Sequence, residues 1–165
     1  MAEYEQNSRP GRIEKDAEGI FANNATKSFL GTMSQIFIAF SGTGAIDDAG
    51  FSFQIPEDYK GNLRFHYIWS MDATGTGQGR ISVRLLKSTD LEKSFIGAPD
   101  EVLEILDDGQ DTAEWLVQIS PTVISDFDWT PGDVCVVELE RQPSHANDTM
   151  ADTLFMSIFV IEYDI

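Results

Sequence analysis

Carboxylates are the most plentiful side chains in this sequence that could do chemistry. The chain has 165 residues, of which 28 are acidic and 11 are basic, with two His and one Cys. Eleven of the acids lie between Asp90 and Asp128, where Lys93 is the single basic residue. Clustered carboxylate oxygens are the ligands that Ca²⁺ prefers, in sets of about six to eight. A cation site in this stretch is therefore the first chemistry to consider.

The tightest group of acids is Asp107, Asp108 and Asp111, which surround Gly109 in one predicted turn. Their spacing differs from that of the helix-flanked calcium loop, in which acids alternate and a Glu closes the loop. Aspartate is also a common turn residue, because its side chain bonds its own backbone. These three residues are weak candidates for metal ligands, and we expect no bound cofactor.

Nucleophilic catalysis would need a nucleophile, a base and a group that orients the base. His66 falls on the polar face of a predicted strand, and His145 follows Ser144 in a predicted loop, where sequence neighbours rarely adopt catalytic geometry. Cys135 alternates with valines in an apolar segment, where a thiol usually packs as a small core side chain. Two carboxylates could hydrolyse glycans, but the sequence sets no separation between them. We therefore predict no catalytic residues and no enzymatic activity.

Aromatic side chains are candidates for glycan binding, because sugar rings stack on exposed aromatic faces. The candidates are Trp69, Trp115, Trp129, Tyr59 and Tyr67. Trp69 shares a predicted strand face with apolar residues, which favours a core position, whereas Trp129 lies at a strand end, where it could be half exposed. Packing in the core is the preferred interpretation for each tryptophan.

The glycine-rich segment 75–79, Gly-Thr-Gly-Gln-Gly, superficially resembles a phosphate-binding loop. A dinucleotide-binding loop needs a strand before it and a helix after it, so that phosphate meets the N-terminal amides of the helix. Here a strand pattern follows, and no Lys-Ser or Lys-Thr pair comes after the glycines. The segment is therefore predicted to be the tip of a hairpin.

A hydrophobic period of two dominates the chain from Met33 onward, which is typical of half-buried β-strands. Residues 62–70 and 80–87 both alternate apolar with polar side chains, and they are predicted to form a long hairpin across the glycine-rich segment. Further strands are predicted at residues 33–40, 51–55, 101–106, 113–120, 122–127, 133–141 and 153–163.

The number and spacing of these strands predict an all-β fold. About eight or nine short strands separated by turn residues are typical of an antiparallel β-sandwich of the jelly-roll type, in which two sheets share one core. The segment 154–161 is almost continuously apolar. This pattern predicts a last strand that is buried on both faces.

Residues 1–28 have no sustained hydrophobic period and contain only scattered apolar side chains, such as Ile13, Ile20 and Phe21. Such a segment buries too little apolar surface to offset the entropy that is lost when it is ordered. We therefore predict an extended N-terminal arm at residues 1–28 and a β-sandwich domain at residues 29–165. The arm would then be free to dock on another subunit.

The formal net charge of −17 disfavours contact with phosphate backbones and anionic lipid head groups. We therefore expect neither nucleic acid nor a membrane as a partner. No apolar run reaches the roughly 18 residues that a membrane span needs, and the polar N-terminus does not resemble a secretory signal. The single Cys cannot form an internal disulfide, and we expect the chain to fold in the host cytoplasm.

Residues spread from about position 50 to the end of the chain carry a family resemblance. They are Phe53-Gln-Ile-Pro56, Tyr59, Gly61, the strand ending in Trp69, Thr130-Pro-Gly-Asp133, Arg141, Asn147-Asp-Thr149, Asp152 and Tyr163. In this arrangement the chain resembles small all-β structural proteins of tailed bacteriophages. The resemblance implies a β-sandwich virion protein, such as a capsid decoration or cement protein or a head or tail appendage, and it assigns no binding residues.

The same resemblance implies the partners and the location of the protein. The partners would be the major capsid protein or other virion proteins, the chain would form a homo-oligomer with a trimer favoured, and it would be located in the virion. The alternative function is a carbohydrate- or receptor-binding module on a phage fibre, in which case a glycan is the ligand.

Overall fold

The computed structural model describes residues 10–30, 35–71, 75–88, 98–109 and 117–165. The regular elements in these residues are all β-strands, which confirms the predicted fold class. The strands are β1 (Gly11–Asp16), β2 (Phe21–Ala22), β3 (Thr26–Leu30), β4 (Gln35–Phe40), β5 (Asp47–Gln54), β6 (Gly61–Met71), β7 (Gln78–Ser88), β8 (Glu101–Asp108), β9 (Gln118–Ile119), β10 (Val123–Ile124), β11 (Val134–Arg141) and β12 (Leu154–Asp164).

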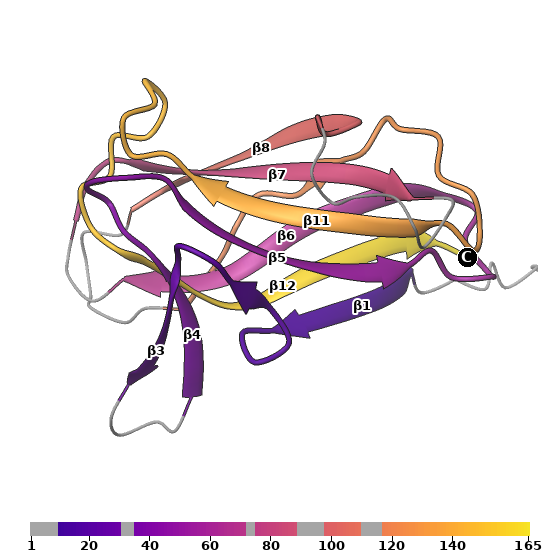
Figure 1. Ribbon diagram of the computed structural model, residues 1–165, viewed down its shortest axis with the longest axis horizontal. Helices are drawn as coiled ribbons and strands as arrows, with labels where there is room; N and C mark the ends of the chain where they lie inside the picture. Colours follow the sequence, from indigo (N-terminus) through magenta and orange to yellow (C-terminus); the bar gives the residue numbers. More distant parts are fainter. Residues whose placement is uncertain (1–9, 31–34, 72–74, 89–97, 110–116) are drawn as a thin grey trace, which may run out of the picture.

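Two antiparallel sheets pack face to face as a β-sandwich (Figure 1). The seven-stranded sheet has the order β10-β6-β12-β4-β3, with β1 also paired to β12 and β9 also paired to β6. The five-stranded sheet has the order β2-β5-β11-β7-β8. Strands that are far apart in the sequence, such as β5 and β11, are therefore neighbours. In the described residues no helix is long and apolar enough to cross a membrane.

The core fills the space between the two sheets. Leu63, Phe65, Tyr67 and Trp69 in β6 are each exposed by 1% or less, because alternate side chains of a strand point to the same face. The inward residues of the five-stranded sheet that join this core include Ile81, Val83, Leu85, Cys135, Val137 and Leu139. The alternation predicted for residues 62–70 and 80–87 is thus confirmed.

Strand β12 occupies the centre of the seven-stranded sheet. Its neighbours are β6 on one side and β1 and β4 on the other. Of the residues from Leu154 to Ile161, all but Ile158 are buried. The predicted burial on both faces is confirmed, because a central strand with covered faces needs no alternation of polar side chains.

The predicted hairpin between residues 62–70 and 80–87 is wrong. Strand β6 pairs with β12, whereas β7 pairs with β11 and β8, so the chain crosses from one sheet to the other between them. Gly77 adopts a φ of 115°, and a Cβ there would lie 2.7 Å from the carbonyl oxygen of Thr149. Glycine is therefore required at this position for close packing against the β11–β12 connection and not for a hairpin tip.

The prediction of a separate N-terminal arm is wrong for residues 10–28. Strand β1 pairs with β12 along its whole length, and β2 pairs with Gly50 and Ala49 in β5. Ala17 and Ile20 are each 1% exposed and belong to the core. The few apolar residues of this segment are enough to order it, because the two sheets supply the rest of the core and the sheet edges offer backbone hydrogen-bonding groups. Residues 1–9 lie outside the described part of the chain.

Deletion of residues 1–28 should therefore destabilise the domain. The truncation uncovers one edge of β12 and one edge of β5, and it removes Ala17 and Ile20 from the core. We expect the melting temperature, followed by circular dichroism against the full chain, to fall by about 10 °C or more. An unchanged melting temperature would contradict the pairing of β1 with β12.

Replacement of Trp69 by alanine should lower the free energy of unfolding by about 3–5 kcal/mol, the usual range for a large buried aromatic side chain. Trp69→Phe is the matched control, because it keeps most of the ring volume but loses the 2.8 Å hydrogen bond from the Trp69 indole to Asp107. We expect the control to lose less stability in urea denaturation. Equal losses would show that the hydrogen bond, and not the cavity, dominates.

Candidate functional site

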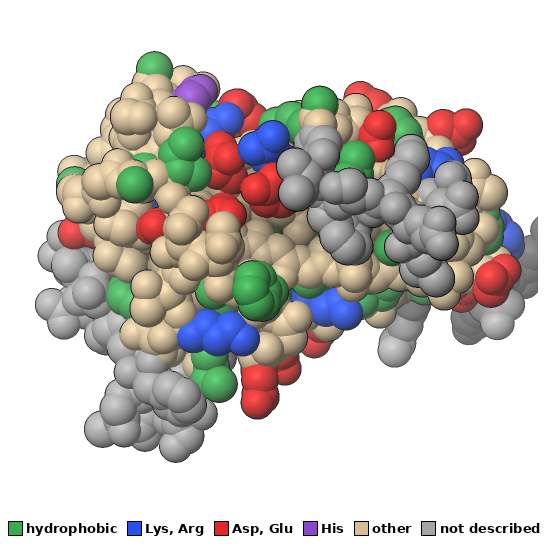
Figure 2. Space-filling model, in the orientation of Figure 1, with side chains coloured by type: hydrophobic (Ala, Val, Ile, Leu, Met, Phe, Trp, Pro, Cys, Tyr) green, Lys and Arg blue, Asp and Glu red, His purple; other side chains and the backbone are tan. Residues whose placement is uncertain are grey.

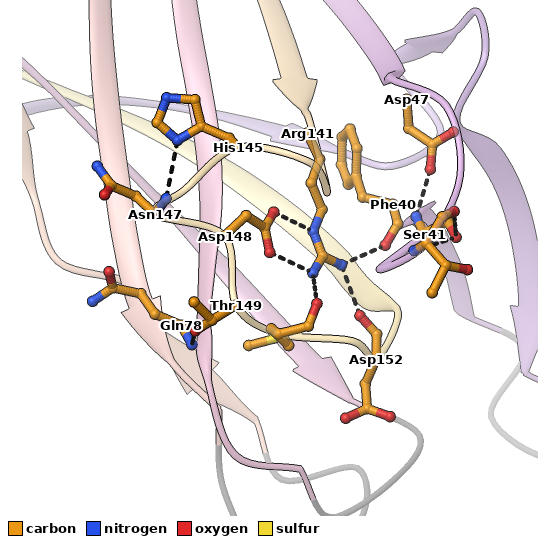
Figure 3. A network of polar contacts seen from close by, with 12 residues as sticks. Phe40, Ser41, Asp47, Gln78, Arg141, His145, Asn147, Asp148, Thr149 and Asp152 are labelled. Atoms are coloured by element: carbon orange, nitrogen blue, oxygen red, sulfur yellow. Dashed lines mark hydrogen bonds and ion pairs between the residues drawn. The ribbon is translucent and has the colours of Figure 1, made fainter.

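The connection between β11 and β12 is organised around the buried side chain of Arg141 (Figure 3). The Arg141 guanidinium donates hydrogen bonds to the two carboxylate oxygens of Asp148 at 2.8 and 2.9 Å. It also donates to the backbone carbonyls of Phe40 at 3.0 Å, Met150 at 2.6 Å and Asp152 at 2.7 Å. All of its N–H donors are thereby used, which fastens the connection to the end of β4.

This network has a structural role. The side chains of Arg141 and Asp148 are both 0% exposed, so neither can touch a ligand. On the outer side of the connection, His145 Nδ1 accepts a hydrogen bond from the backbone amide of Asn147 at 3.2 Å, as Figure 3 shows. Ser144 Oγ lies 3.5 Å from the side-chain amide of Gln142. These contacts shape the loop and do not form a nucleophile and base pair.

The candidate metal ligands are engaged in other contacts or lie outside the described residues. Asp107 accepts hydrogen bonds from the Trp69 indole at 2.8 Å and from the Asp108 backbone amide at 3.0 Å. Burial raises the pKa of the Asp107 carboxyl, and these two hydrogen bonds oppose the shift. Asp108 is exposed, and Asp111 is not described. The described part of the chain contains no group of three or more His, Cys, Asp or Glu side chains that could hold a metal ion.

The remaining candidates for nucleophilic chemistry lie in the sheets. His66 is 8% exposed on the outer face of β6, and its burial lowers the pKa of the imidazole. Cys135 is fully buried in the core, and this burial raises the pKa of its thiol, so the thiolate that attacks electrophiles is suppressed. Cys135 therefore packs as a core side chain, as its alternation with valines predicts.

The aromatic candidates are mostly core residues. Trp69 and Tyr67 are buried, and Trp129, which the sequence allowed to be half exposed, is only 4% exposed. The Trp129 indole donates to Ser125 Oγ at 2.9 Å. Tyr59 is partly exposed, and Trp115 lies outside the described residues. The preferred interpretation of core packing is thus confirmed for Trp69 and Trp129.

A different aromatic residue, Phe21, is 73% exposed and stands at the edge of a hollow on the outer face of the five-stranded sheet. This hollow, named here the Phe21 hollow, has a volume of about 410 Å³. It is lined by Phe21, Asn23, Asp48, Ala49, Gly50, Phe51, Val136, Val137 and Glu138. Sequence reasoning missed it, because Phe21 lies in the segment that was predicted to be an arm.

The strand register explains the hollow. Phe21 in β2 pairs with Gly50 in β5, and Gly50 pairs in turn with Glu138 in β11. Since neighbouring strands are about 4.8 Å apart, the backbones of Phe21 and Glu138 are separated by about 10 Å. Gly50 has no side chain to fill this gap. The phenyl ring and the Glu138 side chain therefore stand on opposite sides of a gap, and the backbone at Gly50 forms the floor of this gap.

Polar groups on the rim of the Phe21 hollow make hydrogen bonds and an ion pair with their neighbours. The Asn23 side-chain amide donates to Asp48 Oδ2 at 2.8 Å, and the Asn24 backbone amide donates to Asp48 Oδ1 at 3.3 Å. Glu138 lies 3.5 Å from Nε of Arg84, which donates from Nη1 to Glu140 at 3.0 Å. Figure 2 shows hydrophobic atoms over β2 and a mixed band of acidic and basic side chains over β11 and β7.

This arrangement is suited to non-covalent binding of a polar ring. An exposed aromatic face can stack on the apolar face of such a ring, and fixed carboxylate and amide groups can bind hydroxyls at its edge. The site stands on paired strands of one sheet, so it is formed before a ligand arrives. No basic side chain is among the residues that line the hollow.

Comparisons with known proteins identify the fold. Neither a model of a known protein family nor a curated protein matches the chain in sequence. Among solved structures, a family 35 carbohydrate-binding module from Clostridium thermocellum matches with a TM-score of 0.56 and 10% identity, over 92% of this chain and 97% of that chain. The CBM36-1 domain of a multidomain xylanase from the hindgut metagenome of Trinervitermes trinervoides matches with a TM-score of 0.55 and 10% identity, over 92% of this chain and 96% of that chain.

Part of a larger enzyme has the same fold. The cycloisomaltooligosaccharide glucanotransferase of Paenibacillus sp. matches with a TM-score of 0.54 and 13% identity. This match covers 89% of the present chain but only 18% of the enzyme. Together these similarities show that the chain has the β-sandwich jelly-roll fold found in carbohydrate-binding modules.

Replacement of Arg141 by methionine should lower the free energy of unfolding by about 3–5 kcal/mol, because it leaves the Asp148 carboxylate buried without its partner. The double variant Arg141→Met/Asp148→Leu removes both charges and should recover part of this loss. Urea denaturation measures both. A single variant as stable as the natural protein would contradict the role assigned to Arg141.

Proposed function

We propose that this chain is a carbohydrate-binding domain that holds a glycan in the Phe21 hollow. The observation that carries the proposal is the exposed ring of Phe21, which lines an open hollow together with Asp48 and Glu138 in a fold shared with carbohydrate-binding modules. The Phe21 ring is 73% exposed and stands beside a hollow, so its apolar face is available to contact a ligand that enters there.

The chemistry of the hollow matches that of a sugar. A pyranose ring has one face of C–H groups, which suits the Phe21 ring, and a rim of hydroxyls, which suits carboxylate acceptors. Charged acceptors give stronger hydrogen bonds than neutral ones, so Asp48 and Glu138 are effective anchors for hydroxyl donors. Asn23 keeps a second amide N–H beyond the one that it donates to Asp48, and this N–H can reach a sugar oxygen.

The proposed role is binding without catalysis. Glycoside hydrolysis needs one carboxyl group to act as an acid and a second to act as a nucleophile or base. Here both Asp48 oxygens already accept N–H hydrogen bonds, and Glu138 faces the guanidinium of Arg84. Neither carboxyl group is arranged to deliver a proton. The solved carbohydrate-binding modules that share this fold are consistent with a binding role.

A virion structural protein that acts by protein contact is the second candidate function. It is favoured by exposed apolar side chains on and beside β9 and β10 of the seven-stranded sheet, where Val117 and Ile119 are each 69% exposed and Ile124 is 50% exposed. Exposed apolar groups of this kind are typical of protein interfaces. A capsid partner, a trimer and a location in the virion stay predictions from the phage resemblance. A glycan-binding module on a phage fibre would satisfy both candidates.

Phe21→Ala should weaken glycan binding at least tenfold, since it removes the stacking surface, which corresponds to about 1.4 kcal/mol of binding free energy. A glycan array identifies a ligand, and isothermal titration then compares the variant with the natural protein. Ile119→Ala is the matched control, because Ile119 is 69% exposed but lies on the other sheet. Unchanged affinity in Phe21→Ala, or equal losses in both variants, would contradict the proposed site.

A further inference from the structure

The ionisable residues that line the Phe21 hollow all carry one sign of charge. Its two ionisable lining residues are Asp48 and Glu138, and both are acids. Each stands on the outer face of the five-stranded sheet, on adjacent strands. A ligand that reaches the floor at Gly50 therefore meets negative charge from both β5 and β11.

Two basic side chains, Arg84 and Lys15, contact lining residues of the hollow but are not themselves among its lining residues. Arg84 lies beyond Glu138 and is shared between Glu138 at 3.5 Å and Glu140 at 3.0 Å, so two carboxylates balance its charge. Lys15 lies 5.8 Å from the centre of the Phe51 ring, and Lys27 donates to the backbone carbonyl of Glu18 at 2.9 Å. None of these three side chains lines the hollow.

The acids of the hollow are also poor partners for another carboxylate. An ionised carboxylate only accepts hydrogen bonds, so it needs a donor from the ligand. A sugar hydroxyl supplies such a donor, whereas a uronate or sulfate group supplies only acceptors and adds like charge. Like charges disfavour association, and the formal net charge of −17 extends this repulsion over the whole domain.

We infer that the Phe21 hollow selects uncharged glycans and rejects glycans that carry carboxylate or sulfate groups. This inference rests on the proposed function, because it concerns the ligand class of the same site. The Phe21 ring supplies affinity to neutral and charged sugars alike, and Asp48 and Glu138 discriminate between them. Glu138 is the specificity-determining residue that can be tested more cleanly, because replacing Asp48 would also disturb its hydrogen bonds from Asn23 and Asn24.

The experiment uses matched pairs of polysaccharides on one array. Each pair contains a neutral chain and its charged counterpart with the same linkage, such as dextran with dextran sulfate, laminarin with laminarin sulfate, and mannan with mannuronan. We expect a neutral member to bind and its charged partner to bind at least tenfold more weakly in low salt. The ratio should shrink in 1 M NaCl, because salt screens the repulsion.

The variant Glu138→Gln tests the residue. It keeps a hydrogen-bonding side chain but removes the charge, so the preference for the neutral member should fall at least threefold. Glu57→Gln is the matched control, because it makes the same change in net charge at an exposed position that does not line the hollow. The control should keep the preference of the natural protein.

The outcomes separate this inference from the proposed function. Equal or tighter binding of charged members overturns the selectivity but leaves glycan binding intact. An equal effect of Glu138→Gln and Glu57→Gln overturns the assignment of selectivity to the hollow. A natural protein that binds no member of any pair, and no other glycan on the array, overturns the proposed function together with the inference.

Discussion

The ion pair between Arg141 and Asp148 is shielded from water on every side, and the path of the chain at this end of the sandwich depends on it. Its guanidinium binds the carbonyls of Phe40, Met150 and Asp152 as well as the carboxylate. These contacts draw the end of β4 and the start of β12 toward β11. Since β4 and β12 belong to one sheet and β11 to the other, a single side chain connects both layers.

Strand β11 links this structural network to the candidate site. Its inward residues, which include Cys135, Val137, Leu139 and Arg141, pack in the core or make the buried ion pair. Its outward residues include Glu138, which lines the Phe21 hollow. The alternation of a β-strand thus places Arg141, which makes the buried ion pair, and Glu138, which lines the proposed glycan site, on opposite faces of one segment. The face of β11 that carries the Phe21 hollow is therefore backed by the buried core.

Much of the fold could be predicted from the sequence, because alternation is a local property. The strands at residues 62–70, 80–87 and 133–141 all lie within observed strands or overlap them almost completely. Which strands pair with one another is not determined locally, and for this reason the predicted hairpin between β6 and β7 was wrong. The same limit applies to β1 and β2. Their few apolar residues are enough to order them only because they pair with strands of the two sheets that the rest of the chain forms.

The candidate site was much harder to predict. Trp69 and Trp129 could be assigned to the core from their apolar neighbours, but Phe21 carries no such signal, since it follows Ile20 in a polar stretch. The residues of the Phe21 hollow come from β2, the residue Asn23 just after it, β5 and β11, and only the pairing of these strands brings them together. The sequence motif around Arg141 and Asp148 did draw attention to an important group, but its role is structural.

Nuclear magnetic resonance mapping of a bound glycan tests the central claim most directly. The isotope-labelled full chain is titrated with a neutral glycan that binds on the array, and backbone amide shifts are followed. The account predicts the largest changes at Phe21, Asn23, Gly50 and Glu138, with little change at Asn147 in the β11–β12 connection. Shift changes concentrated in the β11–β12 connection, with unchanged shifts for the four amides of the hollow, would contradict the proposed glycan site.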